Sequence, residues 1–106
     1  MGKSPRRKPV RLGGKLRQIR TSFQVSQDGI LVLMDLADEY TRNNVSNFEL
    51  NRREPPLYLL LQYARIAGIC LDLLADDSAD LPSTLPGIPV HSGVQTAIPG
   101  RRGAKN

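Results

Sequence analysis

Apolar residues in the first half of the chain recur every three or four positions, the period that places them on one side of an α-helix. The first series predicts a helix from residue 12 to about residue 22, and its members are Leu12, Leu16, Ile19 and Phe23. A second helix should begin at Ser26, because a serine hydroxyl can accept hydrogen bonds from the free amides at a helix start. Apolar residues surround this helix almost completely over residues 30–37. We therefore expect it to be the central helix, buried on more than one side.

The same kind of pattern predicts three shorter helices. Thr41 is the next candidate cap, and the helix after it should end near Leu50, because Asn51 tolerates the left-handed conformation that often closes a helix. The fourth helix should end at Gly68, and its expected apolar face consists of Leu57, Leu60, Leu61, Ala64 and Ala67. A short fifth helix fits the apolar residues Ile69, Leu71 and Leu74.

The two ends of the chain follow neither a helical nor a strand period. Residues 1–11 combine prolines with like charges, which predicts a flexible basic arm. Residues 82–106 hold four prolines and four glycines, which predicts a disordered tail. No stretch alternates between apolar and polar positions, so the folded part, residues 12–81, should be an all-α domain of five helices without a sheet.

The formal charge of +5 is unevenly distributed along the 106 residues. Residues 1–20 carry +8 and no acid, residues 21–81 carry −6, and residues 82–106 carry +3. A basic arm joined to an acidic body indicates a polyanionic partner for the arm, although a tail that only keeps a protein soluble has a similar composition.

The sequence does not combine the groups that an enzyme or a metal centre requires. The only histidine, His91, lies in the predicted tail, and the only cysteine, Cys70, is expected to be a packing residue. The acids Asp35, Asp38 and Glu39 are typical of a solvated helix face. We therefore expect no catalytic activity, no bound metal and no cofactor.

The chain offers no sequence signal for a membrane. Its longest apolar stretch, residues 30–34, is much shorter than the roughly 20 residues that span a bilayer. No apolar segment of a secretory signal follows the basic start. We expect a cytoplasmic protein.

The third predicted helix has one apolar and one polar side. Val45 and Phe48 would face the core, and the residues off that face include Arg42, Asn43, Ser46 and Asn47. The major groove of DNA admits one α-helix, and its base edges pair with arginine, asparagine and serine side chains. These residue types are also common on any solvated surface, so the pattern alone leaves both interpretations open.

Five segments, taken in order, resemble the phage-repressor (Xre-type) helix-turn-helix family. They are KLRQIR at 15–20, VSQ at 25–27, VSNFE at 45–49, REP at 53–55 and LLQYARIAGI at 60–69. The similarity covers residues 12–74. It implies a five-helix, lambda-repressor-like DNA-binding domain whose recognition helix, at about residues 42–50, lies in the major groove.

The resemblance also implies roles for individual residues. The positions at which the family reads bases are occupied by Arg42, Asn43 and Asn47, with Ser46 close by. The positions that contact phosphate are occupied by Gln27, Asn51, Arg52 and Arg53. Arg20 and Glu49 stand where many relatives have a structural ion pair between the first helix and the end of the third.

The basic arm provides further candidate contacts with the DNA backbone or a minor groove, namely Arg6, Arg7 and Lys8. A leader that only keeps the protein soluble is an equal alternative. One departure from the family lies between Ser26 and Thr41, where the chain is about four residues longer, roughly one helical turn. Either the second helix is longer, or the connection is a loop that brings the acids Asp38 and Glu39 near the DNA.

The function that the sequence favours is a sequence-specific DNA-binding transcriptional regulator. It would act in the nucleoid as a homodimer on double-stranded DNA with two-fold symmetry. One alternative is a protein-interaction module, such as an antitoxin-like subunit that holds a partner protein. Another is non-specific nucleic-acid binding through the arm.

Overall fold

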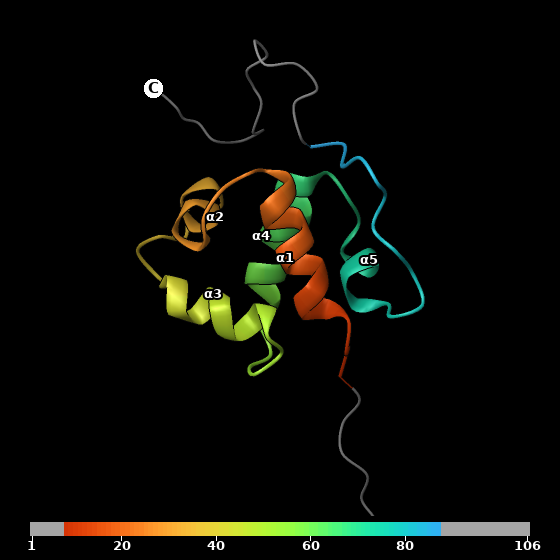
Figure 1. Ribbon diagram of the computed structural model, residues 1–106, viewed down its shortest axis with the longest axis horizontal. Helices are drawn as coiled ribbons and strands as arrows, with labels where there is room; N and C mark the ends of the chain where they lie inside the picture. The colour runs from red at the N-terminus through yellow and green to blue at the C-terminus, as the bar shows by residue number, and fades with distance from the viewer. Residues whose placement is uncertain (1–7, 88–106) are drawn as a thin grey trace, which may run out of the picture.

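Five α-helices and no strand make up the part of the chain that the computed structural model describes, residues 8–87. The helices are α1 (Leu12–Ser22), α2 (Gln27–Leu33), α3 (Arg42–Glu49), α4 (Leu57–Ala67) and α5 (Leu71–Ala75). In Figure 1, α1 and α4 cross in the middle, α2 and α3 lie on one side of them, and α5 lies on the other. The predicted all-α class with five helices is confirmed.

The core is built around α1. This helix packs against α3, α4 and α5, whereas α2 packs mainly against α3. Leu16 and Ile19 of α1 are completely buried, as is Tyr63 of α4. The apolar side that the spacing of residues predicted for α1 therefore faces α3, α4 and α5.

The prediction that the second helix is central and buried on several sides is wrong. The helix has only seven residues, and Val32 is 57% exposed. It stops because Asp35 takes a left-handed conformation, with φ of 61°. The rest of the apolar run belongs to the connection after the helix, from which Met34 and Leu36 enter the core.

The buried face of α4 also differs from the predicted one. Leu57 is 70% exposed, and the buried residues are Leu59, Tyr63, Ala64, Ile66 and Ala67. Nearly every position of this helix is apolar, so the spacing alone allowed more than one face. Its predicted end is correct, because Gly68 takes the left-handed conformation at φ of 73°.

The caps that begin α2 and α3 are the predicted ones. Ser26 Oγ accepts a hydrogen bond from the Gly29 amide at 3.0 Å. Thr41 Oγ1 accepts one from the Asn44 amide, and Asn44 Oδ1 accepts one from the Thr41 amide, which closes a reciprocal capping box. The first turn of α3 is therefore fixed by its own side chains.

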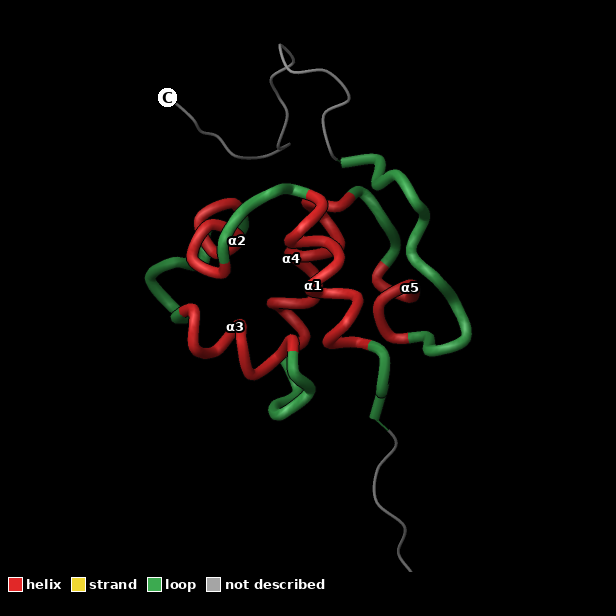
Figure 2. The backbone as a smooth tube through the Cα atoms, viewed as in Figure 1, coloured by secondary structure: helices red, strands yellow, loops and turns green. Residues whose placement is uncertain are grey.

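The predicted limits of the arm and the tail both need correction. The tail does not begin at residue 82, because Leu85 is buried and the Gly87 amide donates to the Ala67 carbonyl at 2.9 Å. Figure 2 shows the described chain continuing after α5 as a loop. At the other end, the backbone of Val10 and Arg11 is hydrogen-bonded to Asp77. The rest of the predicted arm and tail, residues 1–7 and 88–106, lies outside the described residues.

The start of α1 lies directly against the end of α3, and Gly13 makes this approach possible. A Cβ atom at residue 13 would lie 2.4 Å from the Glu49 carbonyl oxygen and 2.7 Å from that of Phe48. Both are backbone atoms of a buried junction, so neither can move aside easily. Gly14, the next residue, has nothing within 4 Å of such an atom.

These two glycines form a matched pair for mutation. We expect Gly13→Ala to lower the free energy of unfolding by about 2 to 3 kcal/mol, because the added methyl group forces α1 and α3 apart. We expect Gly14→Ala to raise it by about 0.5 to 1 kcal/mol, because alanine favours the helix and meets open space. Urea unfolding of the two variants measures both effects, and equal stability of the two would contradict the close approach.

Candidate nucleic-acid interface

The orientation of α3 is set by its apolar side. Val45 is fully buried and Phe48 is 4% exposed. The Phe48 ring meets Tyr40 edge to face, with ring centroids 6.4 Å apart. These contacts anchor the helix to the interior, so its polar side is held toward solvent.

The four candidate base-reading residues lie together on that polar side. Arg42 and Asn43 are exposed, and Ser46 and Asn47 are half-buried. Within residues 8–87, the side chains of Asn43, Ser46 and Asn47 form no hydrogen bond. The Arg42 guanidinium lies 3.7 Å from the Asp28 carboxylate. Both side chains are exposed to solvent, so this ion pair adds little stability. Donors and acceptors of the kind that pair with base edges are therefore available on one short helix face.

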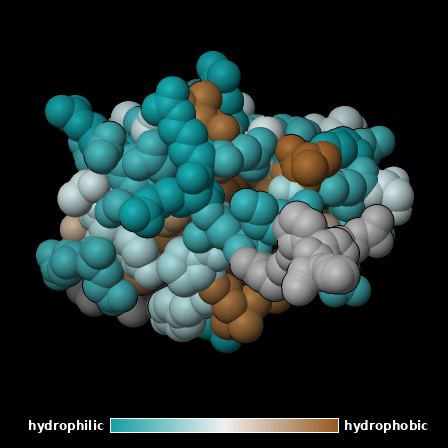
Figure 3. Space-filling view, turned by 90° about the horizontal axis from the view of Figure 1, so that it is seen from below, coloured by the Kyte–Doolittle hydropathy of each residue, from teal (hydrophilic) through white to brown (hydrophobic). Residues whose placement is uncertain are grey.

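Cations border this face where α3 ends. Arg52 and Arg53 are exposed in the loop after the helix and line a shallow pocket together with Lys8, which comes from the segment before α1. Figure 3 views the molecule from the side of α3 and this loop, and most of that surface is hydrophilic, with small separate hydrophobic patches. Of the candidate arm residues, Arg6 and Arg7 lie outside the described residues.

Two candidate phosphate contacts are engaged within the protein. Asn51 has φ of 60°, and its side chain accepts from the Gly13 amide at 3.0 Å and donates to the Val10 carbonyl at 3.2 Å. It thus caps α1, which has no capping side chain of its own. Gln27 is half-buried, and its Nε2 donates to Glu49 at 3.3 Å. Phosphate contacts from these side chains would compete with bonds that already exist.

The predicted ion pair between α1 and α3 is present. Arg20 Nε donates to Glu49 Oε2 at 2.6 Å, and Arg20 Nη2 donates to Oε1 at 3.1 Å. The arginine side chain is 15% exposed and the glutamate side chain 5%. The hydrogen bond to Glu49 raises the pKa of Arg20 above its usual value. The pair lies near Tyr63, whose phenol pKa is raised by burial.

The segment between the second and third helices is a loop, not an extension of the second helix. Eight residues, 34–41, connect α2 to α3, and Leu36 anchors them in the core. The acids Asp35, Asp38 and Glu39 are exposed in this loop. They give the start of α3 an acidic neighbourhood, whereas Arg52 and Arg53 give its end a basic one.

Two basic residues near the start of α1 bind the end of α5 and the loop that follows it. Lys15 is 3% exposed, and its Nζ donates to the carbonyls of Leu73 and Asp76, at the end of α5. Arg11 pairs with Asp80. The free carbonyls at the end of a helix favour a nearby ammonium group. The sequence could not predict that Lys15 occupies such a position, because this depends on the packing of α5 beside α1. Cys70, expected to be a packing residue, is exposed before α5.

No metal-binding group and no membrane span is found in the described part of the chain. Within residues 8–87, no three His, Cys, Asp or Glu side chains are grouped so that they could hold a metal ion. No helix there combines the length and apolar character needed to cross a bilayer. No family model, curated protein or solved structure matches this chain.

Removing one partner of the Arg20–Glu49 pair should destabilise the domain. We expect Glu49→Ala to lower the free energy of unfolding by about 3 kcal/mol, because the arginine is left in a largely buried place without its acid. For a domain of this size that corresponds to a fall of about 10 °C or more in the melting temperature.

The exposed acid Glu39 supplies the control, and we expect Glu39→Ala to leave the melting temperature nearly unchanged. The double variant Arg20→Ala/Glu49→Ala should be more stable than the sum of the two single losses predicts. Additive losses would show that the two groups are not coupled.

Proposed function

We propose that this protein is a sequence-specific DNA-binding transcriptional regulator with a phage-repressor-type helix-turn-helix domain. The observation that carries the proposal is the two-sided character of α3. Val45 and Phe48 bind it to the core, and Arg42, Asn43, Ser46 and Asn47 present polar groups on the other side. A helix held in this way fits a major groove, and its side chains match the donors and acceptors of base edges.

Asparagine and arginine give this face a chemical preference. An asparagine amide pairs with both N6 and N7 of adenine, and an arginine guanidinium pairs with O6 and N7 of guanine. Asn43 and Asn47 are four residues apart, so they lie on the same side of α3 about one turn apart. They would meet successive base pairs along the groove.

The residues next to α3 would hold the DNA backbone. Arg52, Arg53 and Lys8 present positive charge beside the end of the helix. Such contacts fix the position of the domain on the duplex without reading its sequence.

We further propose that the regulator acts as a homodimer on a two-fold operator. Leu50, Leu57 and Tyr58 are exposed large apolar side chains near the junction of α3 and α4, and they offer apolar area for contact between subunits. Two recognition helices related by a two-fold axis would contact half-sites about 34 Å apart, which is one turn of DNA.

Selection of bound sequences from a random DNA pool tests the proposal. We expect an enriched motif with inverted half-sites at a fixed spacing, in the presence of competitor DNA and physiological salt. The same exposed apolar residues fit a protein-interaction module of the antitoxin-like kind. Absence of any enriched motif, together with stoichiometric co-purification of a partner protein, would replace the regulator by that alternative.

The base-reading role of α3 can be tested residue by residue. With the selected site as ligand, we expect Asn43→Ala or Asn47→Ala to reduce discrimination at one or two base pairs by roughly 1 to 3 kcal/mol each. Thr84→Ala removes an exposed polar side chain from the segment beyond α5 and serves as the control. Binding to single-base-pair variants of the site measures the change. Loss of affinity that is equal for every sequence would argue against base contacts.

The backbone-contacting role of the loop gives a different signature. We expect Arg52→Ala and Arg53→Ala each to weaken binding to all duplexes alike and to reduce the slope of log K against log salt by about 0.9. Arg65→Ala, in the last turn of α4, removes the same charge from an exposed position away from the loop. If this control changes the salt slope as much as the loop variants do, the loop arginines make no specific phosphate contact.

A further inference from the structure

The Asn51 side chain joins two segments of backbone that are far apart in the sequence. Its Oδ1 accepts a hydrogen bond from the Gly13 amide at 3.0 Å, and its Nδ2 donates one to the Val10 carbonyl at 3.2 Å. Asn51 itself belongs to the loop after α3 and has φ of 60°. One planar amide group therefore ties this loop to the backbone at the start of α1.

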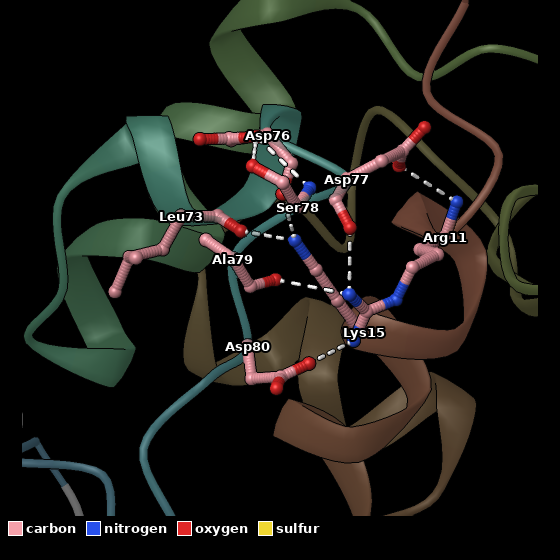
Figure 4. A network of polar contacts seen from close by, with 8 residues as sticks. All are labelled: Arg11, Lys15, Leu73, Asp76, Asp77, Ser78, Ala79 and Asp80. Carbon is pink, nitrogen blue, oxygen red and sulfur yellow. Dashed lines mark hydrogen bonds and ion pairs between the residues drawn. The ribbon is translucent and has the colours of Figure 1, made fainter.

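A second anchor holds the same backbone from the side of α5. The Asp77 carboxylate accepts hydrogen bonds from the amides of Val10 and Arg11, at 2.9 and 3.0 Å. The Arg11 guanidinium donates to the Asp77 carbonyl at 2.7 Å, and Figure 4 shows the contacts between these two residues. Asp77 thus holds the amide of Val10, whereas Asn51 holds its carbonyl. Of the two anchors, the Asn51 bond is the one that connects this segment to the loop after α3.

The two joined segments bring three cations to one place. Lys8 comes from the segment before α1, Arg52 and Arg53 come from the loop after α3, and all three line one shallow pocket. They are exposed to solvent. Glu54 also lines the pocket, so the cations outnumber the acids there. The pocket therefore has the net positive charge that attracts a phosphate group.

The position of Lys8 depends on how the backbone of Val10 is held. Only one residue, Pro9, lies between them. The proline ring fixes its own φ, and it also disfavours the helical conformation in the residue before it. The two residues before Val10 thus have few backbone conformations once the Val10 carbonyl is bound. Order that Asn51 imposes on Val10 therefore extends to Lys8.

We propose that Asn51 is a positioning residue for DNA binding. By holding the Val10 carbonyl it keeps Lys8 beside the two loop arginines, so that the three cations contact the phosphate backbone together. The inference rests on the proposed function. Asn51 itself contacts no phosphate, because both polar atoms of its side chain are bonded within the protein. It contributes order that exists before binding, so less order has to be created when the duplex binds.

The salt dependence of binding distinguishes this role from a direct contact. The slope of log K against log salt reflects the cations that meet phosphates, at about 0.9 per contact. A hydrogen bond from a neutral asparagine to a phosphate replaces no counterion, so its loss weakens binding without changing the slope. Loss of a positioned lysine changes both the affinity and the slope. A neutral substitution at Asn51 that lowers the slope therefore identifies a positioning residue.

The experiment uses the variant Asn51→Gly in the full chain. Glycine adopts a positive φ without strain, so this substitution removes two side-chain hydrogen bonds and no charge. The ligand is a fluorescein-labelled duplex of mixed sequence. We expect Lys8→Gln to reduce the slope by about 0.9 and Asn51→Gly to reduce it by at least half as much. An unchanged slope in Asn51→Gly would overturn the proposal.

Two comparisons locate the effect. Gln24 is exposed between α1 and α2 and has nearly the same φ, 61°, so we expect Gln24→Gly to leave the slope unchanged. In a Lys8→Gln chain we expect Asn51→Gly to cause no further fall in the slope, because the cation that it positions is gone. A further fall in that background, or an equal fall in the Gln24 variant, would show that Asn51 does not act through Lys8.

Melting curves show whether each variant folds. If Asn51→Gly does not fold, Asn51→Asp replaces it, because aspartate keeps the acceptor for the Gly13 amide and lacks the donor for the Val10 carbonyl. Gln24→Glu then adds the same charge in the control. The slope should again fall more in the variant at residue 51 than in its control, and equal slopes would overturn the proposal.

A measurement without DNA separates this inference from the proposed function. A nitroxide label is attached to residue 8 in a chain with Lys8→Cys and Cys70→Ser. We expect it to broaden the amide signals of Arg52 and Arg53, which line the same pocket as residue 8. The signal of Gly68 should broaden less, because Gly68 lies against the end of the described chain, at the opposite edge of the domain in Figure 1.

The same label shows whether the placement depends on Asn51. We expect Asn51→Gly to reduce the difference in broadening between the loop and Gly68, and an unchanged difference would overturn the positioning role. If the chain binds no duplex while the difference is present and depends on Asn51, the proposed function fails and the placement of Lys8 stands.

Discussion

The domain depends on the contact between the start of α1 and the end of α3. Gly13 lets the backbones approach so closely that a side chain of any size would meet the carbonyl oxygens of Phe48 and Glu49. Two turns further along α1, Arg20 reaches the Glu49 side chain. The helix that carries the candidate base-reading residues is thus attached at its end by a steric and an ionic contact to the helix at the centre of the core. Whatever α3 presents to a ligand, it presents at an angle set by α1.

The helices themselves could be predicted from the sequence to within a few residues because caps and breakers are local signals. Thr41, Gly68 and the period of α1 each act within one or two turns. The length of α2 could not be predicted in this way. A run of apolar residues has the same pattern whether the residues belong to a helix or to a buried loop. The left-handed conformation of Asp35, which ends the helix, does not change the spacing of the apolar residues.

The candidate site was predictable as a set of residue types on α3, but not in its relation to the rest of the chain. The exposure of Asn43 follows from helical geometry once Val45 and Phe48 are buried. The roles of Asn51, Lys15 and Arg11 depend on contacts across 38 to 69 positions of sequence, which only the packing of α5 and α3 around α1 creates. The basic residues near the start of the chain therefore have different roles. Lys15 and Arg11 form contacts that hold the fold together, whereas Lys8 is exposed beside Arg52 and Arg53.

The attachment of Gly87 to the end of α4 has a practical consequence for anyone who joins another protein to this one. A side chain at this position would overlap the Ile66 carbonyl, and the Gly87 amide is bonded to Ala67. The described chain therefore leaves the domain at the edge opposite to the one at which it enters. A reporter or a surface-immobilisation tag placed after residue 87 starts on the far side from α3, whereas one placed directly before residue 8 starts beside Arg52 and Arg53 and would obstruct that face.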